Sequence, residues 1–203
     1  MTPLLDSRKD SKRALILGAA RRRFGRFGIR ATTMQEIARD TDIAVGTIYQ
    51  FFPDKDALIR AWVTEHCQQM HDELVNVLRQ PVHAEDKLRQ FLTLRFRAER
   101  AMREEAPMHE VAKAVRRLMP EMVQETVAAV FGYLRTILEE GRETGSLPSV
   151  EPDADSEILF HSLRGFFPTV DDPILGPPEE KTMLRVIDWF VAKWKLPRPK
   201  SQP

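Results

Sequence analysis

Apolar residues recur with helical spacing along almost the whole chain, and this pattern restricts the possible folds most. They lie three and four positions apart, and hardly any alternating segment is long enough for a β-strand. Prolines fall between the amphipathic segments, where a missing N–H and a fixed φ angle disturb a helix least. These separating prolines are Pro53, Pro81, Pro107, Pro120, Pro148, Pro168, Pro177 and Pro178. The sequence therefore predicts an all-α protein of about nine helices.

The first predicted helix spans about residues 11–27. Its apolar face consists of Leu17, Ala20, Phe24 and Phe27, and arginines cover the remaining surface. Gly28 follows directly, and a glycine after the last helical turn commonly adopts the left-handed conformation that ends a helix.

A capping box is predicted at Thr33-x-x-Glu36, where the hydroxyl and the carboxylate satisfy free backbone N–H groups. A short helix then runs from Met34 to about Thr41. Residues 42–44 form a tight turn, and a second short helix covers residues 45–52. Pro53 ends that helix, and Asp54 caps a long helix over about residues 55–78.

Two short helices joined by a three-residue turn and braced by a longer helix form a helix-turn-helix arrangement. Since the second short helix cannot hold itself together, we expect Ile48, Phe51 or Phe52 to pack into a core formed by Phe24, Phe27, Ile37 and Leu58. Its other face is then free to enter a major groove. There Gly46 permits close backbone approach, and Thr47, Tyr49 and Gln50 offer hydrogen bonds to phosphate or base edges.

The charge distribution is uneven, although the net charge of the chain is only +1. Residues 1–62 contain 12 Lys and Arg against 7 Asp and Glu, whereas residues 63–203 contain 19 against 23. A basic segment at one end suits a polyanionic partner. The alternative is an ordinary solvated helix surface, so charge alone does not indicate nucleic acid.

Lys55 provides a separate indication, because a cation in the first turn of a helix opposes the helix dipole at about 0.3–1 kcal/mol. A phosphate held between Lys55 and the free N–H groups reverses that penalty. The alternative is an exposed lysine that is tolerated at a small cost.

Two segments carry a family resemblance: Thr33-Met34-Gln35-Glu36-Ile37-Ala38, and the run from Ile43 to Leu58 that contains Gly-Thr-Ile-Tyr and Phe-Pro-Asp-Lys. Residues 13–58 resemble the DNA-binding domain of TetR-family transcriptional regulators. The resemblance implies phosphate contacts by Thr33, Thr47, Tyr49 and Lys55, and base readout by Val45, Gly46 and Gln50. Ala44 departs from the family pattern, since many members have a serine there.

The resemblance also implies an all-α homodimer with a helix-turn-helix domain at residues 1–54 and a helical effector-binding and dimerisation domain at residues 55–203. The last two predicted helices have broad apolar faces that fit a four-helix dimer interface. The expected interface residues are Leu159, Leu163, Phe166, Phe167, Ile187, Phe190, Val191 and Trp194. The alternative is that both faces pack inside the monomer.

The middle helices carry aromatic and Met side chains that would suit an apolar effector pocket. The candidates are His66, Met70, Phe91, Leu94, Met102, Met108, Phe131, Leu134 and Phe160. Ordinary core packing is the alternative for each of them. Arg95, Arg97, Arg100 and Arg103 suggest an anionic effector. However, Arg95, Glu99 and Arg103 are spaced four residues apart, as are Arg100 and Glu104, and this spacing describes a solvated face.

No feature of the sequence indicates an enzyme, a cofactor or a metal site. Cys67 and His71 lie four apart, a spacing that metals use, but two ligands do not make a site. No HExxH motif, phosphate-binding Gly-rich loop or nucleophile elbow occurs. A single cysteine, no apolar leader segment and no long apolar run favour a cytoplasmic protein without membrane contact.

The sequence thus predicts a ligand-responsive repressor that binds a palindromic DNA operator as a homodimer and is released by a small lipophilic effector. One alternative is a DNA-binding dimer without a small-molecule effector, controlled by a protein partner or by its abundance. Another is a helical enzyme or carrier whose helix-turn-helix has lost its function.

Overall fold

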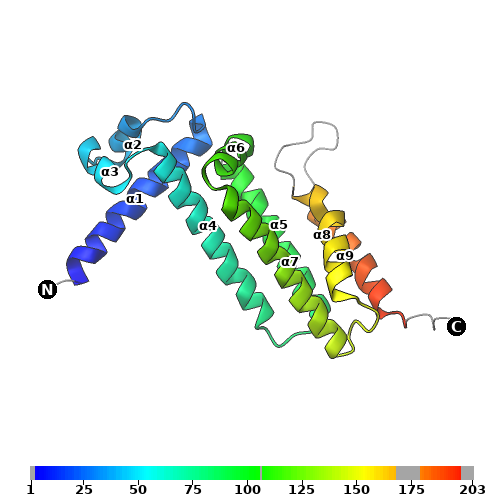
Figure 1. The fold of residues 1–203 in the computed structure, drawn as a ribbon. Helices are drawn as coiled ribbons and strands as arrows, with labels where there is room; N and C mark the ends of the chain where they lie inside the picture. The colour runs from blue at the N-terminus through cyan, green and yellow to red at the C-terminus, as the bar shows by residue number, and fades with distance from the viewer. Residues whose placement is uncertain (1–2, 106, 168–178, 198–203) are drawn as a thin grey trace. The chain divides into compact units, whose positions relative to one another are not determined.

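The computed structural model describes residues 3–105, 107–167 and 179–197. Within these ranges the chain is helical throughout, without a strand (Figure 1). The helices are α1 (Pro3–Phe27), α2 (Met34–Thr41), α3 (Val45–Phe51), α4 (Lys55–Leu78), α5 (Ala84–Glu105), α6 (Met108–Leu118), α7 (Pro120–Glu143), α8 (Pro152–Leu163) and α9 (Glu180–Lys195), with a 3-10 turn η1 (Arg164–Phe166) after α8. Over the described residues, the all-α prediction and its nine helices are confirmed.

The chain divides into two compact units, here called the head and the body. The head comprises Met1–Gln68 and Arg100–Val123, and the body comprises Gln69–Glu99 and Gln124–Pro203. The sequence predicted a boundary after residue 54 instead. The head extends further because the first turns of α4 and the buried face of α6 belong to its core, through Ile59, Trp62, Val111, Ala114 and Leu118.

The head is built around α1, which contributes Ile16, Leu17, Ala20 and Phe24 to the core. Gly28 follows α1 with a φ of +85°, so the predicted left-handed helix end is confirmed. Phe27 was predicted to join this core, but it is exposed. The guanidinium groups of Arg23 and Arg26 lie over its ring, at 5.4 and 5.1 Å from the ring centre.

The capping box predicted at the start of α2 is present. The Thr33 hydroxyl accepts a hydrogen bond from the Glu36 backbone N–H at 3.3 Å, and the Glu36 carboxylate accepts one from the Thr33 backbone N–H at 2.8 Å. Asp42 follows α2 with a φ of 53°, a left-handed conformation that Asp tolerates better than most residues. The chain thereby reverses within three residues and begins α3.

The body is a helical bundle with its own core, to which α5, α7, α8 and α9 all contribute. A buried ammonium also links α5 to α7 and to the end of α4: the Lys87 Nζ donates hydrogen bonds to both Glu140 carboxylate oxygens, at 2.8 and 2.7 Å, and to the Leu78 carbonyl at 2.9 Å. No helix within the described ranges is long and apolar enough to cross a membrane.

The apolar faces of α8 and α9 are mostly buried inside the protomer. Of the eight expected dimer residues, six belong to the body core: Leu159, Leu163, Ile187, Phe190, Val191 and Trp194. Phe166 and Phe167 are half-buried against the same core. For these six side chains the expectation that they face a second subunit is therefore corrected, because they are buried in a core with α5 and α7 side chains of their own chain. For Phe166 and Phe167 it stays a prediction.

Candidate nucleic-acid interface

Helix α3 has one buried and one exposed face. Ile48 is fully buried and Phe52, directly after the helix, is nearly so, in a core shared with Phe24, Ile37 and Leu58. The predicted anchoring of this seven-residue helix is therefore confirmed, with Phe51 only partly buried. The anchors fix the helix and leave its opposite face without a packing partner in the head.

The exposed face carries most of the residues that were expected to contact DNA. Val45 is 38% and Tyr49 46% exposed, Gly46 and Gln50 are exposed, and Thr47 is half-buried. A side chain added at Gly46 would meet no atom within 4 Å, so packing inside the chain does not demand a glycine there. Ala44 precedes α3 without a side-chain capping bond, as expected for a residue that lacks a hydroxyl.

Thr33 lies at the N-terminal end of α2 and is exposed. Its hydroxyl donates a hydrogen bond to the Glu36 carboxylate at 2.9 Å and accepts one from the Glu36 backbone N–H. Hydrogen bonds to the Glu36 carboxylate, first from the Thr33 backbone N–H and then from the Thr33 hydroxyl, hold the pKa of this carboxyl below its ordinary value. The start of α2 is thus fixed before any contact with DNA.

Lys55 is half-buried at the first residue of α4, where its ammonium is already engaged. Nζ donates to the backbone carbonyls of Ile29, Arg30 and Thr32, at 2.6, 3.4 and 2.9 Å. These three bonds occupy the three donors of an ammonium group. The predicted phosphate contact is not tested here, but in this structure Lys55 fastens the connection between α1 and α2.

Arg23 braces α1 against α2, a role that the sequence analysis missed. Its guanidinium donates two hydrogen bonds to Asp40, at 2.6 and 3.0 Å, and lies 3.2 Å from Glu36. These hydrogen bonds hold the pKa of Asp40 below its ordinary value. The basic residues of α1 therefore differ in role, since Arg21, Arg22 and Arg26 are exposed while Arg23 is largely covered.

Helix α6 also holds the head together, a role that was not predicted from the sequence. The Glu110 carboxylate accepts hydrogen bonds from the backbone N–H groups of Ile29 and Arg30, at 2.7 and 3.2 Å. Arg117 forms a two-bond ion pair with Asp56 of α4, at 2.9 and 2.8 Å. The connection before α2 is therefore held by Glu110 on α6 and by Lys55 on α4.

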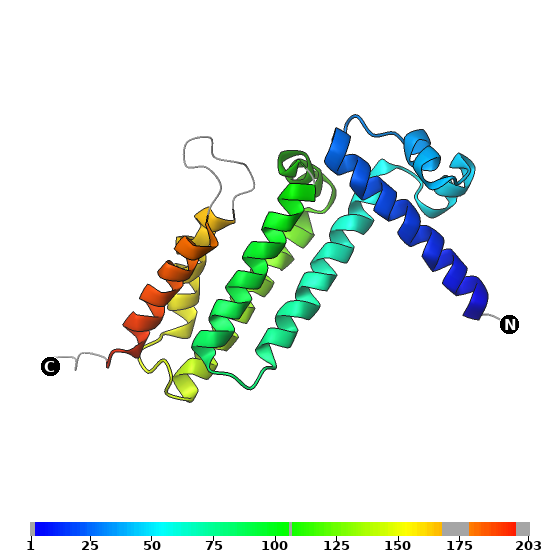
Figure 2. The same cartoon turned by 180° about the vertical axis from the view of Figure 1, so that it is seen from behind.

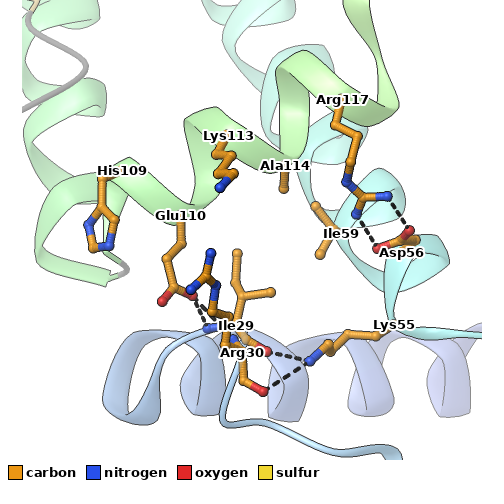
Figure 3. A pocket seen from close by; sticks show the side chains of 10 residues that line it. All are labelled: Ile29, Arg30, Lys55, Asp56, Ile59, His109, Glu110, Lys113, Ala114 and Arg117. Carbon is orange, nitrogen blue, oxygen red and sulfur yellow. Dashed lines mark hydrogen bonds and ion pairs between the residues drawn. The ribbon is translucent and has the colours of Figure 1, made fainter.

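These contacts surround a cavity of about 400 Å³ within the head (Figure 3). Its walls come from the connection between α1 and α2, the first turns of α4, and α6. Four cationic side chains and two carboxylates line it. A second cavity of about 430 Å³ lies beside Gly28 and shares Glu110 with the first.

The nine effector candidates are divided between the two compact units. His66 and Met102 belong to the head, whereas Met70, Phe91, Leu94, Phe131, Leu134 and Phe160 belong to the body; the side chain of Met108 is outside the described part. Phe91 and Leu134 are fully buried core residues. Phe131 and Phe160 do meet, with ring centres 4.4 Å apart. Neither of the two cavities above is lined by any candidate.

Arg95 does not lie on a solvated face as its spacing suggested. It is half-buried, and its guanidinium carbon lies 4.7 Å from the ring centre of Phe167. Burial lowers the pKa of this guanidinium, and the charge of Glu99 opposes that effect. Arg100 and Glu104 do form the expected exposed pair, at 3.2 Å.

Cys67 and His71 are not gathered into a larger ligand set. In the part of the chain that the structure covers, no three His, Cys, Asp or Glu side chains are grouped so that they could hold a metal ion. The His71 ring nitrogen Nδ1 forms a hydrogen bond with the Tyr133 hydroxyl.

The structure therefore defines a two-unit helical protein of the helix-turn-helix class. Comparison with known proteins narrows this class. The family model described as "Bacterial regulatory proteins, tetR family" matches residues 16–62. The model described as "Tetracyclin repressor-like, C-terminal domain" matches residues 84–170. The chain belongs to the TetR family of DNA-binding transcriptional regulators.

Bacterial relatives match most of the chain. An uncharacterised HTH-type transcriptional regulator, YhgD of Bacillus subtilis, is 25% identical over 90% of this chain and 95% of its own. The HTH-type transcriptional repressor Rv1474c of Mycobacterium tuberculosis is 27% identical over 80% of this chain and 86% of its own. A crystal structure of a transcriptional regulator from Cytophaga hutchinsonii superimposes with a TM-score of 0.75 at 22% identity, covering 91% and 99% of the two chains.

Proposed function

We propose that the chain is a repressor that binds a palindromic DNA operator as a homodimer through the exposed face of α3. One observation carries the proposal: Ile48 and Phe52 anchor α3, while Tyr49 and Gln50 on its other side contact nothing that would hide them. A helix fixed in this way meets the geometric requirement for entering a major groove.

The contacts divide into two kinds. Thr33, Thr47 and Tyr49 contact phosphates and set the register, and Val45, Gly46 and Gln50 lie against base edges. Glycine at position 46 serves the approach of the DNA backbone, since the chain itself leaves that space empty. Lys55 supports binding indirectly, because its ammonium holds the carbonyls that precede α2.

Dimerisation uses the solvent side of α8 and α9. Ile158 on α8 is 49% and Trp189 on α9 is 62% exposed, so each offers apolar surface that a partner can bury. A side chain added at Gly165 would meet no atom within 4 Å, so a partner's backbone can approach there. Two copies joined on this face present two α3 helices to half-sites about 34–36 Å apart.

A small lipophilic effector bound in the body releases the operator. The half-buried Met70 and Leu94 and the stacked pair Phe131–Phe160 provide adaptable apolar surface for it. By linkage, an effector that lowers operator affinity is itself bound more weakly by the DNA-bound protein.

The competing function is a DNA-binding dimer without a small-molecule effector, controlled by a protein partner or by abundance. It is favoured by the complete burial of Phe91 and Leu134, which leaves these candidates without room for a ligand. Thermal unfolding of the protein with a set of lipophilic compounds separates the two functions. A stabilised protein supports the effector, since a ligand that binds only the folded state raises the melting temperature.

The experiment for DNA binding is selection of duplexes from a randomised library by the purified protein. We expect a two-fold symmetric site whose half-sites are one helical turn apart. The Gln50→Ala variant should select altered bases in each half-site, and Gln35→Ala, an exposed change on α2, should select the wild-type site. Failure to enrich any symmetric duplex would refute the proposal.

A further inference from the structure

We infer that the head contains a binding site for a small organic carboxylate, in the cavity between α6, the start of α4 and the connection from α1 to α2. This site is separate from α3 and from the effector site proposed for the body.

The floor of the cavity is apolar. Ile59 and Ala114 lie almost fully buried on it, and Ile29 is 7% exposed beside them. Its volume of about 400 Å³ falls at the small end of the range of about 300–1,000 Å³ that ligand pockets span. The space is therefore sized for a small molecule with an apolar part.

The charges on the wall are unbalanced, with four cationic side chains and two carboxylates. Both carboxylates are already in use, since Asp56 pairs with Arg117, and Glu110 accepts the backbone N–H groups of Ile29 and Arg30. The Lys55 ammonium donates its hydrogen bonds to backbone carbonyls. This leaves two cations whose charge no described carboxylate neutralises.

These two cations are Arg30 and Lys113, which face the same space. Figure 3 shows the Lys113 ammonium and the Arg30 guanidinium directed into the cavity from opposite walls. Neither side chain forms an ion pair or a hydrogen bond within the described residues. Like charges repel at such a place unless an anion lies between them, and a planar guanidinium matches a carboxylate with two parallel hydrogen bonds.

The apolar floor distinguishes the ligand from an inorganic ion. Phosphate or chloride satisfies the two cations but has no apolar part to pack against the floor, whereas an aromatic or short aliphatic acid has one. DNA is a poor occupant as well. Within the head, α6 and α3 lie on opposite sides of the C-terminal end of α1 in both views (Figure 1 and Figure 2).

A carboxylate bound in the cavity can influence the start of α2 and thereby the proposed DNA-binding face. It neutralises Arg30, whose backbone N–H is held by Glu110 and whose carbonyl lies near Lys55, three residues before the capping residue Thr33. We expect it to lower DNA affinity, a consequence that depends on the proposed function. The binding itself does not depend on that function.

The test is isothermal titration calorimetry of the full chain without DNA, with benzoate, phenylacetate and hexanoate as probes. Benzamide keeps the ring without the charge, and inorganic phosphate keeps the charge without the ring. We expect at least one of the three carboxylates to bind, more tightly than either comparator, and added NaCl to weaken that binding.

The variants are Lys113→Gln alone and together with Arg30→Gln. Both side chains are exposed, so the fold should persist, and thermal unfolding checks this. The matched control removes two exposed head arginines that do not line the cavity, through Arg39→Gln with Arg116→Gln.

The double variant should raise the dissociation constant of the bound carboxylate at least tenfold, and the control variant should leave it unchanged. The inference is overturned if no probe carboxylate binds, if benzamide or phosphate binds as tightly, or if the cavity variants and the control behave alike. Since no step uses DNA, failure here leaves the proposed function standing.

Discussion

The Glu110 carboxylate accepts a hydrogen bond of 2.7 Å from the backbone N–H of Ile29, which lies 81 residues earlier in the chain. The same oxygen accepts the N–H of Arg30. Glu110 on α6 therefore accepts the hydrogen bonds of two backbone N–H groups that lie beyond the end of α1 and have no acceptor within that helix.

We expect Glu110→Ala to free these two N–H groups and to destabilise the connection before α2. A hydrogen bond to a charged group contributes about 1.5–3 kcal/mol. Amide hydrogen exchange measures the effect directly, and it should accelerate at residues 29 and 30. Glu104→Ala, which removes an exposed carboxylate paired with Arg100, should leave both rates unchanged. Equal exchange in the two variants would argue against the role of Glu110.

Two glycines of α7 should respond in opposite directions to alanine. A Cβ at Gly141 would lie 2.7 Å from the Leu147 Cδ1 and 3.1 Å from the Ala84 Cβ, whereas one at Gly132 would meet nothing within 4 Å. Overpacking destabilises a protein by about 1–3 kcal/mol, whereas replacing a helical glycine by alanine stabilises the helix by about 1 kcal/mol. Chemical denaturation should show Gly141→Ala destabilised and Gly132→Ala stabilised. A stabilised Gly141→Ala would mean that Leu147 moves aside freely.

Ile158→Asp should weaken the proposed dimer without disturbing the protomer. The side chain is half exposed on α8, so a carboxylate there stays hydrated in the monomer but is buried in the proposed interface. Sedimentation equilibrium should show an increased monomer fraction. Val123→Asp introduces the same charge at an exposed apolar residue of the head and should leave the dimer intact. Unchanged association of Ile158→Asp would exclude this face.

The ion pair between Asp56 and Arg117 should make stability depend on acidity. The hydrogen bonds from Arg117 hold the pKa of the Asp56 carboxyl below its ordinary value, about 3.9. Because the pKa of Asp56 is lower in the folded than in the unfolded protein, its ion pair stabilises the fold at pH values above the ordinary pKa. This stabilisation is lost as the pH falls through the folded-state pKa.

The free energy of unfolding of wild type should therefore exceed that of Arg117→Gln near neutral pH, and the difference should shrink below about pH 4. Urea denaturation at a series of pH values measures it. Arg116→Gln, which removes the neighbouring charge on α6, supplies the comparison and should show no such change. A difference for Arg117→Gln that does not vary with pH would mean that the pair contributes nothing.

The helices of the helix-turn-helix could be located from sequence alone because their determinants are local. The capping box joins residues three positions apart, Gly28 acts on its own backbone, and the apolar spacing that buries Ile48 lies within one short helix. Each is visible in a window of a few residues.

Contacts between residues far apart in the chain could not be predicted from the sequence. Nothing near Glu110 indicates that its carboxylate caps residues 29 and 30, and nothing near Lys55 indicates three carbonyl acceptors. The breadth of the apolar faces on α8 and α9 correctly predicted burial but not the partner. Leu159 and Trp194 pack within their own chain, whereas Ile158 and Trp189 are exposed, and only the structure distinguishes the buried side chains from the exposed ones.

Site-specific crosslinking to DNA tests the central claim most directly. A photoreactive phenylalanine analogue at Tyr49 is irradiated with a duplex selected by the wild-type protein, and the same analogue at Trp189, which is also exposed, serves as the comparison. The account predicts a covalent adduct from position 49 and none from position 189. An adduct from position 189 with none from position 49 would contradict it.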